Sequence, residues 1–322
     1  MRCTGGRTTM LIVRQFPDAD SPVHGPDEAA GARPGSAQET TVICARARYA
    51  RCPPQKHNLC INAIRGGAIH FVVGNRRISV DDDTYLIFNE GRTFSALLRE
   101  PHEAEGLIIF YAPGALAEVL SALNVAPERL LDGAEPPPDP WQFTESLRWH
   151  DTLVSPLLNA IRANVSAGDS DADPAWLETH CLLLLESAVV AEQQLRGAAV
   201  RIASLRSSTR DELYRRVNWA ADFIQSNYGR PLSLQEVADA ARLSKYHLVR
   251  SFRQMHGVTP HTLLLEKRVR VARRLIETTD FDLNEIAERS GFGTRWSMFR
   301  QLRRRFGVSG RELRGRDDTT IL

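Results

Sequence analysis

The sequence lacks the features of membrane proteins, exported proteins and disulfide scaffolds. None of its apolar runs approaches the ~20 residues that a membrane-spanning helix needs. The longest run near the start, Met10–Val13, is too short for the core of a signal peptide. The five cysteines are sparse, odd in number and without a CxxC pair, which argues against a disulfide framework and a clustered zinc site. We therefore expect a cytoplasmic protein without a cofactor.

The sequence also lacks the common catalytic motifs. It has no nucleophile elbow, no glycine-rich phosphate-binding loop and no HExxH zinc motif. His57, His70 and His102 are single and far apart, and none belongs to an HxH pair. We therefore predict that the protein is not an enzyme and holds no metal.

What is present is an ordinary globular balance with an uneven distribution of charge. Hydrophobic residues make up 43% and charged residues 25% of the 322 residues, a length suited to two or three domains. Residues 211–322 hold 21 Lys and Arg against 14 Asp and Glu, whereas residues 1–210 hold 20 against 25. A basic rear behind an acidic front indicates that the rear meets a polyanion.

The front of the chain changes pattern twice. Residues 1–38, rich in Pro, Gly and Asp, have the composition of a mobile tail. From about Thr40 to Tyr111, short runs of β-branched and aromatic residues alternate with Gly, Asn and Asp, as in Ile69–Val73 before the turn Gly74–Arg77. This pattern predicts an antiparallel sandwich or barrel.

Helical periodicity follows, and we expect helices over 115–124, 141–163 and 174–197. The last carries an apolar stripe at heptad spacing, which allows two interpretations. It can pack within its own domain, or it can form a dimer interface because its apolar surface exceeds one seam. The stripe consists of Leu177, Cys181, Leu184, Ala188, Ala191 and Leu195. We assign 39–200 to a regulatory and dimerisation domain and 201–212 to a linker.

The rear of the chain contains an internal repeat. The segment from Leu234 to Thr259 aligns with the segment from Leu283 to Ser309 at an offset of 49, rising to 50. The matching positions are Glu236/Glu285, Ala238/Ala287, Arg250/Arg300, Arg253/Arg303 and Gly257/Gly307. Such a duplication indicates a repeated supersecondary unit, and each copy is typical of a helix-turn-helix.

The second helix of each unit combines an apolar back with a basic outer face. Leu248 and Phe252 lie behind Arg250 and Arg253 in the first copy, and Arg300 and Arg303–Arg305 recur in the second. This arrangement suits the major groove of DNA. A long helix between the units could hold the two second helices about one DNA turn, roughly 34 Å, apart.

These residues resemble the DNA-binding domain of the AraC/XylS-type regulators, over about residues 214–314. The resemblance rests on Leu234–Arg253, Gly257–Pro260, Arg268, Ala272, Leu275, Glu285–Ala287, Gly291, Phe292, Arg300 and Phe306–Ser309. The front is similar to the cupin-like domain that these regulators often carry, on the strength of its strand pattern and Asp83–Gly91. The resemblance implies an α+β protein, with an N-terminal cupin-like barrel and appended helices before an all-α DNA-binding domain at 213–315.

The resemblance also implies roles for individual residues on the two second helices. It assigns base reading to Tyr246, Val249, Arg250, Arg295, Trp296, Ser297 and Arg300. It assigns phosphate contacts to Lys245, Arg253, Thr294, Arg303 and Arg304. Trp296 could instead be a core residue. The chain departs from the family pattern at Arg242, Leu302 and Gly310, where Gly, an aromatic residue and Pro are usual.

The resemblance implies a regulator of transcription. We expect it to be a homodimer that binds promoter half-sites in two successive major grooves. It would contact RNA polymerase if it activates. A small-molecule effector could bind the N-terminal barrel near Arg65, His70 and Tyr85. Two alternatives stay open. Cys52, beside Arg51, could sense oxidants together with Cys60, or the front could be a cupin enzyme fused to a DNA-binding domain.

Overall fold

The computed structural model describes residues 11–13, 38–124, 141–166, 173–200 and 207–307. The chain divides into two compact units, 1–198 and 199–322. The first combines a nearly closed, mainly antiparallel sheet with helices and the second is helical, so the α+β prediction is confirmed. No helix in the described ranges is long and apolar enough to cross a membrane.

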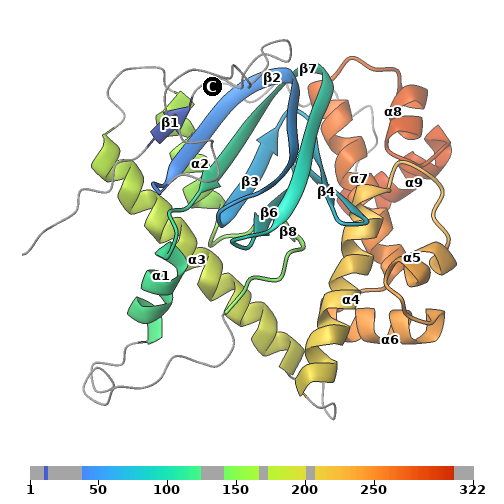
Figure 1. Ribbon diagram of the computed structural model, residues 1–322. Coiled ribbons are helices and arrows are strands. Elements are labelled where there is room, and N and C mark those ends of the chain that lie inside the picture. The colour runs from blue at the N-terminus through green and yellow to red at the C-terminus, as the bar shows by residue number, and fades with distance from the viewer. Residues whose placement is uncertain (1–10, 14–37, 125–140, 167–172, 201–206, 308–322) are drawn as a thin grey trace, which may run out of the picture. The chain divides into compact units, whose positions relative to one another are not determined.

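The N-terminal unit is organised around one curved sheet (Figure 1). Its strands are β1 (Leu11–Val13), β2 (Thr41–Lys56), β3 (Cys60–Arg65), β4 (Ala68–Val73), β5 (Arg76–Asp81), β6 (Thr84–Phe88), β7 (Thr93–Phe110) and β8 (Leu147–Trp149). The path runs β1-β2-β7-β3-β6-β8, and β4 joins β5 to β7. The first half of the long strand β7 pairs with β4 and the second half with β3, and both halves pair with β2. This double pairing curls the sheet toward closure.

The two faces of the sheet bury separate apolar clusters, as the period-2 alternation of a strand requires. In β3, Cys60 and Ile64 belong to the cluster inside the curl, whereas Ile61 and Ala63 face the helices. The helical layer consists of α1 (Ala115–Asn124), α2 (Ser155–Ser166) and α3 (Pro174–Val200). The Tyr111 hydroxyl donates to the Cys181 carbonyl oxygen at 3.0 Å and ties α3 to the end of β7.

The heptad stripe of α3 packs within its own domain. Leu177, Cys181, Leu184, Ala188 and Ala191 are all buried in the cluster between the sheet and the helices. Only the sixth stripe residue, Leu195, is exposed, at 48%. The five buried side chains are therefore core residues. The dimer hypothesis would require them to be exposed for contact with a second chain, and they are not.

Three element boundaries differ from the sequence predictions. The helix expected over 141–163 begins at Ser155, because residues 147–149 form β8 and Asp151 accepts from the Val154 amide at 2.6 Å just before the helix. Residues 11–13, expected to be mobile, pair as β1 with β2. Helix α4 starts at Ser207, inside the expected linker. Residues 1–10 and 14–37 of the expected tail, the linker residues 201–206 and the departure at Gly310 lie outside the described residues.

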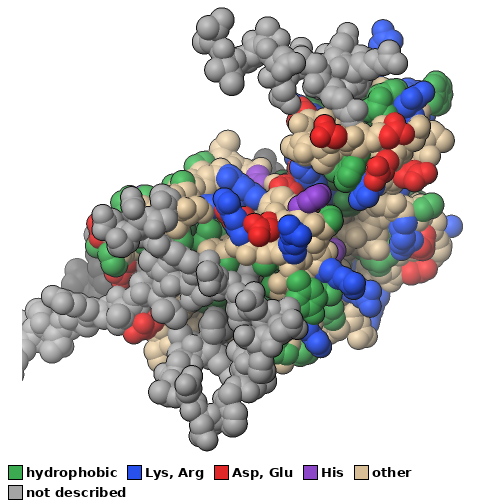
Figure 2. All heavy atoms as spheres, turned by 90° about the horizontal axis from the view of Figure 1, so that it is seen from above, with side chains coloured by type: hydrophobic (Ala, Val, Ile, Leu, Met, Phe, Trp, Pro, Cys, Tyr) green, Lys and Arg blue, Asp and Glu red, His purple; other side chains and the backbone are tan. Residues whose placement is uncertain are grey.

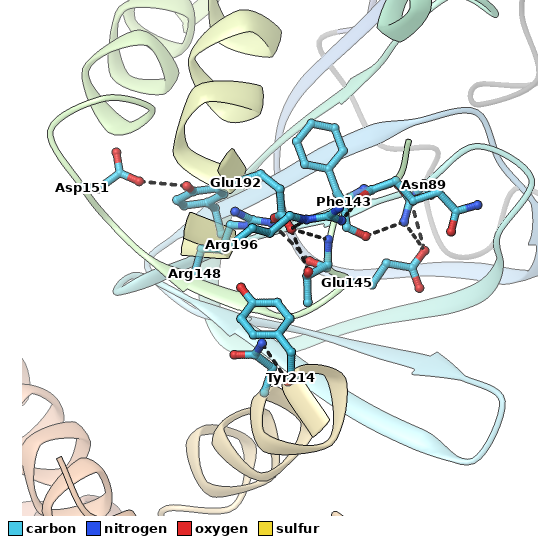
Figure 3. A network of polar contacts seen from close by, with 12 residues as sticks. Asn89, Phe143, Glu145, Arg148, Asp151, Glu192, Arg196 and Tyr214 are labelled. Carbon is cyan, nitrogen blue, oxygen red and sulfur yellow. Dashed lines mark hydrogen bonds and ion pairs between the residues drawn. The ribbon is translucent and has the colours of Figure 1, made fainter. Parts of the chain in front are cut away.

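A buried polar network joins α3 to β8 and to the segment before it (Figure 3). Glu192 is 0% exposed and pairs with Arg148, which is 5% exposed on its side chain. The Thr144 hydroxyl and Arg196 Nε each donate to Glu192 Oε1 at 2.7 Å. Burial alone would raise the pKa of Glu192, but Arg148 and the hydrogen bonds from Arg196, Arg148 and Thr144 outweigh it and lower that pKa.

The C-terminal unit contains two helix-turn-helix pairs around a connecting helix. Its helices are α4 (Ser207–Ser226), α5 (Leu234–Ala240), α6 (Lys245–His256), α7 (Pro260–Thr278), α8 (Leu283–Arg289) and α9 (Arg295–Phe306). The second pair has its own cluster, in which Ile286, Ala287, Met298 and Leu302 pack on the α7 residue Ala272 and its neighbours. Small Ala287 lets α9 approach α8 closely, as this motif requires.

Candidate nucleic-acid interface

The second helices of the two pairs, α6 and α9, are built alike. Each has 12 residues, with a hydroxyl cap at its start and a glycine at its end. Ser244 accepts from the His247 amide at 3.2 Å, and Thr294 accepts from the Ser297 amide at 3.3 Å. Gly257 and Gly307 end the helices in the left-handed region, at φ 71° and 72°. The repeat therefore yields two second helices of equal length.

The residues predicted to read bases lie on the outer faces of these helices. Tyr246 is 71% and Trp296 is 70% exposed. Exposed side chains also include Arg250, Arg295 and Arg300, whereas Val249 and Ser297 are half-buried. The exposure of Trp296 excludes the core interpretation. Its indole ring lies 4.6 Å from the Arg300 guanidinium, a cation–π contact that holds Arg300 against the helix surface.

The residues predicted to contact phosphate are exposed as well. They are Lys245, Arg253, Thr294, Arg303 and Arg304. The hydroxyl of Thr294 caps α9 at the start of the helix, where free amides favour anions. On the face that Figure 2 shows, Lys and Arg side chains lie among Asp and Glu side chains.

The turns of the two pairs share a left-handed residue, although their sequences differ. Arg242 has φ 53° in the first turn, and Gly291 has φ 79° in the second. Arg242 therefore adopts the backbone conformation for which the family pattern uses glycine. The Arg242 carbonyl oxygen accepts from Arg216 Nη1 at 3.2 Å, which holds the turn against α4.

Replacement of Arg242 by glycine should stabilise the protein by about 0.5–1 kcal/mol. The left-handed region costs a side chain-bearing residue about 1–2 kcal/mol, and the greater entropy of unfolded glycine offsets part of the gain. Urea unfolding of wild type and Arg242→Gly would measure the difference. Arg242→Ala keeps the strained conformation, so it serves as the control and should leave stability near the wild-type value.

The structure does not bring the three predicted effector residues to one site. Tyr85 is buried on the helix-facing side of the sheet and donates to Asp151 Oδ2 at 2.8 Å. Arg65 donates to Asn159 Oδ1 of α2 at 2.7 Å. His70 is exposed beside Ser79. None of them belongs to the apolar cluster inside the curl, so they do not line the barrel interior.

Sequence reasoning missed a buried arginine next to Arg65. Arg162 of α2 is buried and forms an ion pair with Glu105 Oε1 at 3.3 Å. Burial and the nearby Arg65 lower the pKa of Arg162, and burial, Arg162 and Arg65 together lower the pKa of His150. A single arginine in a helical stretch carries no sequence signal of burial, which depends on the packing of α2 on the sheet.

The histidines and the acidic residues do not assemble a metal site in the part of the chain that the structure describes. His57 is buried with its ring centroid 4.0 Å from that of Phe94, and burial lowers its pKa to about 4. His70 and His102 are exposed.

Cys52 and Cys60 have the environment of unreactive thiols. Burial raises the pKa of Cys52 despite a hydrogen bond from Gln55, and raises the pKa of Cys60 to about 12. The expected lowering of the Cys52 pKa by Arg51 is not found. Because the thiolate is the reactive form, these shifts argue against oxidant sensing.

Serine at Cys52 and Cys60 should therefore leave the response to peroxide unchanged. Both thiols are protonated at neutral pH, so brief peroxide treatment should alter the DNA affinity of wild type and of the double variant to the same small extent. Gel-shift titrations before and after treatment would measure it. A peroxide effect that disappears in the double variant would restore the redox hypothesis.

Residues 237–316 match the helix-turn-helix domain family. The transcriptional activator RhaS of Enterobacter sp. (strain 638) is 33% identical over 136 residues, which are 41% of this chain and 49% of that protein, so the match spans about half of the relative's length. RhaS of Shigella dysenteriae serotype 1 is 29% identical over 97% of this chain and 94% of the relative. The solved structure of ToxT from Vibrio cholerae is 12% identical over 85% of this chain and 97% of that chain, with a TM-score of 0.33.

The family match and the geometry of α5–α6 and α8–α9 define the class. The C-terminal unit is a helix-turn-helix domain of the kind that binds double-stranded DNA. Two such motifs in one chain, together with the similarity to the RhaS activators, confirm the resemblance to the AraC/XylS-type regulators found in the sequence.

Proposed function

We propose that the protein is a sequence-specific regulator of transcription that reads two successive major grooves with α6 and α9. The observation that carries this proposal is the matched pair of capped, 12-residue helices whose exposed faces bear Arg250 and Arg300. Arginine can donate two hydrogen bonds to guanine O6 and N7, the commonest specific contact in the major groove.

Within this proposal, the residues predicted to read bases keep that role. The basic side chains at the ends of the helices supply affinity. Arg303 and Arg304 lie in the last turn of α9, beyond the base-reading positions, where they would contact phosphate. Such contacts fix the register on the duplex without reading sequence, and they make binding depend on salt.

The N-terminal unit would receive the signal. A ligand that binds one arrangement of the protein more tightly shifts the population toward it, and thereby changes occupancy of promoter half-sites. The names of the RhaS relatives describe activators, which supports activation and a contact with RNA polymerase for this protein as well. If the protein is a homodimer, surfaces other than the five buried stripe residues of α3 must form the interface.

Selection of bound sequences from random DNA with the full-length protein tests the proposal. The expected result is enrichment of two short motifs separated by about one helical turn, roughly 10–10.5 base pairs. The matched control is the double variant Arg250→Ala/Arg300→Ala, which should enrich neither motif strongly. Recovery of unbiased DNA by the wild type would refute sequence-specific reading.

A further inference from the structure

The two helix-turn-helix pairs are joined by more than the connecting helix. Arg268 lies on α7 and reaches the turn between α4 and α5, which precedes the first pair. It donates from Nε to the Tyr228 carbonyl oxygen at 2.9 Å and from Nη2 to the Arg230 carbonyl oxygen at 2.8 Å. The planar guanidinium thus holds two carbonyl groups of one turn in a fixed direction.

The turn of the second pair packs against the same carbonyl group. A Cβ atom on Gly291 would lie 2.2 Å from the Tyr228 carbonyl oxygen, 2.9 Å from Arg268 Nε and 3.1 Å from Gly229 Cα. The approach is between backbones, so only glycine fits at this point. The turn between α8 and α9 therefore touches both Arg268 and the turn that Arg268 holds.

The α4–α5 turn is in turn tied to the start of α5. Arg230 Nη1 donates to Glu236 Oε1 at 2.7 Å, and the Ser233 amide donates to Glu236 Oε2 at 2.8 Å. Ser233 and Glu236 form a capping box, which fixes the first turn of α5. A continuous set of contacts thus runs from Gly291, beside α9, through Tyr228 and Arg230 to the helix that packs under α6.

We propose that Arg268 is a positioning residue that sets the angle and separation at which α6 and α9 are presented, so that the protein accepts paired half-sites at one spacing only. A change of one base pair moves the second half-site by about 3.4 Å along the axis and about 35° around it. A helix connection alone can bend to follow such a change, whereas a two-carbonyl clamp packed against Gly291 resists it. The inference rests on the proposed function, since it concerns how the same two readers select DNA.

The test uses full-length protein and duplexes that carry both selected half-sites at separations of two fewer to two more base pairs, together with a duplex in which one half-site is scrambled. For the wild type, a one-base-pair change should weaken binding about tenfold or more, because one reader loses its base contacts. In Arg268→Ala the penalty should shrink to about threefold or less, while affinity for the single half-site stays within about twofold. Arg268→Lys, whose single amine lacks the planar fork, should give an intermediate profile.

Arg270→Ala is the matched control, since Arg270 is exposed on the same helix two residues away. It should keep the wild-type spacing profile. If Arg268→Ala binds DNA more weakly by the same factor at every spacing and on the single half-site, the positioning role is overturned. A spacing profile of Arg268→Ala equal to that of the wild type would overturn it as well. If the alanine variant shows no cooperative melting, Arg268→Lys takes the same measurements and decides the question.

The outcome also separates this inference from the proposed function. A wild type that prefers its selected motifs but tolerates every spacing would overturn the role of Arg268 alone. A wild type that binds scrambled and selected DNA equally would remove both proposals.

Discussion

Alanine at Arg300 is expected to weaken binding to the selected DNA by about 1–3 kcal/mol and to relax the preference at one base pair of the second half-site. Arg300 lies in the middle of α9, is exposed and is held over Trp296, so its guanidinium is ordered before it meets a base. Arg250 occupies the matching position of α6, and its alanine variant should act on the first half-site.

Arg303→Ala is the control for this prediction, because Arg303 is exposed one turn beyond Arg300 and is assigned to phosphate. Its loss should weaken binding to all sequences alike and reduce the slope of log affinity against log salt by about 1. Fluorescence anisotropy on duplexes with each base pair replaced, repeated across a salt series, distinguishes the two behaviours. Equal effects of all three substitutions on every DNA would contradict the assignment of roles.

Alanine at Glu192 should destabilise the N-terminal unit by about 3–5 kcal/mol. Glu192 is fully buried against Arg148, and its removal leaves a buried guanidinium without its charge partner. Urea unfolding would measure the loss. Glu186→Ala, an exposed change on the same helix, should stay within about 0.5 kcal/mol of wild type. A loss at Glu192 no larger than at Glu186 would mean that the network adds nothing to stability.

The pH dependence of stability follows from the lowered pKa of Glu192. A carboxyl group whose pKa is lower in the folded state contributes its full stability above the unfolded-state value, near 4.5, and loses it as the pH falls through the folded-state pKa. The wild-type advantage over Glu192→Gln should therefore be constant at neutral pH and shrink below about pH 4.5.

The C-terminal unit could be predicted closely because its signals are local. Ser233, Ser244 and Thr294 mark helix starts, and Gly257 and Gly307 mark helix ends, so each boundary is encoded within one turn of sequence. The repeat then supplied the pairing of helices. The contact of Gly291 with Tyr228 escaped prediction, since it joins turns more than sixty residues apart.

The N-terminal unit was predicted in class but not in detail, because its boundaries depend on distant partners. The apolar residues before Ser155 are spaced in a way that suits either a helix or a strand. Leu147–Trp149 form a strand only because they pair with β6. The polar halves of β2 and β7 lack a strand-like composition. They form strands because they pair with each other. The stripe of α3 faces inward because a sheet lies beside it, which a heptad pattern alone does not reveal.

The separation of core and reading face in the second helix-turn-helix has a practical consequence. Met298 and Leu302 anchor α9 from behind, while Arg295, Trp296 and Arg300 point away from that anchor. The outward set can thus be rewritten without repacking the interior. Retargeting by design, or drift of the promoter sequence during evolution, can then proceed one half of the operator at a time.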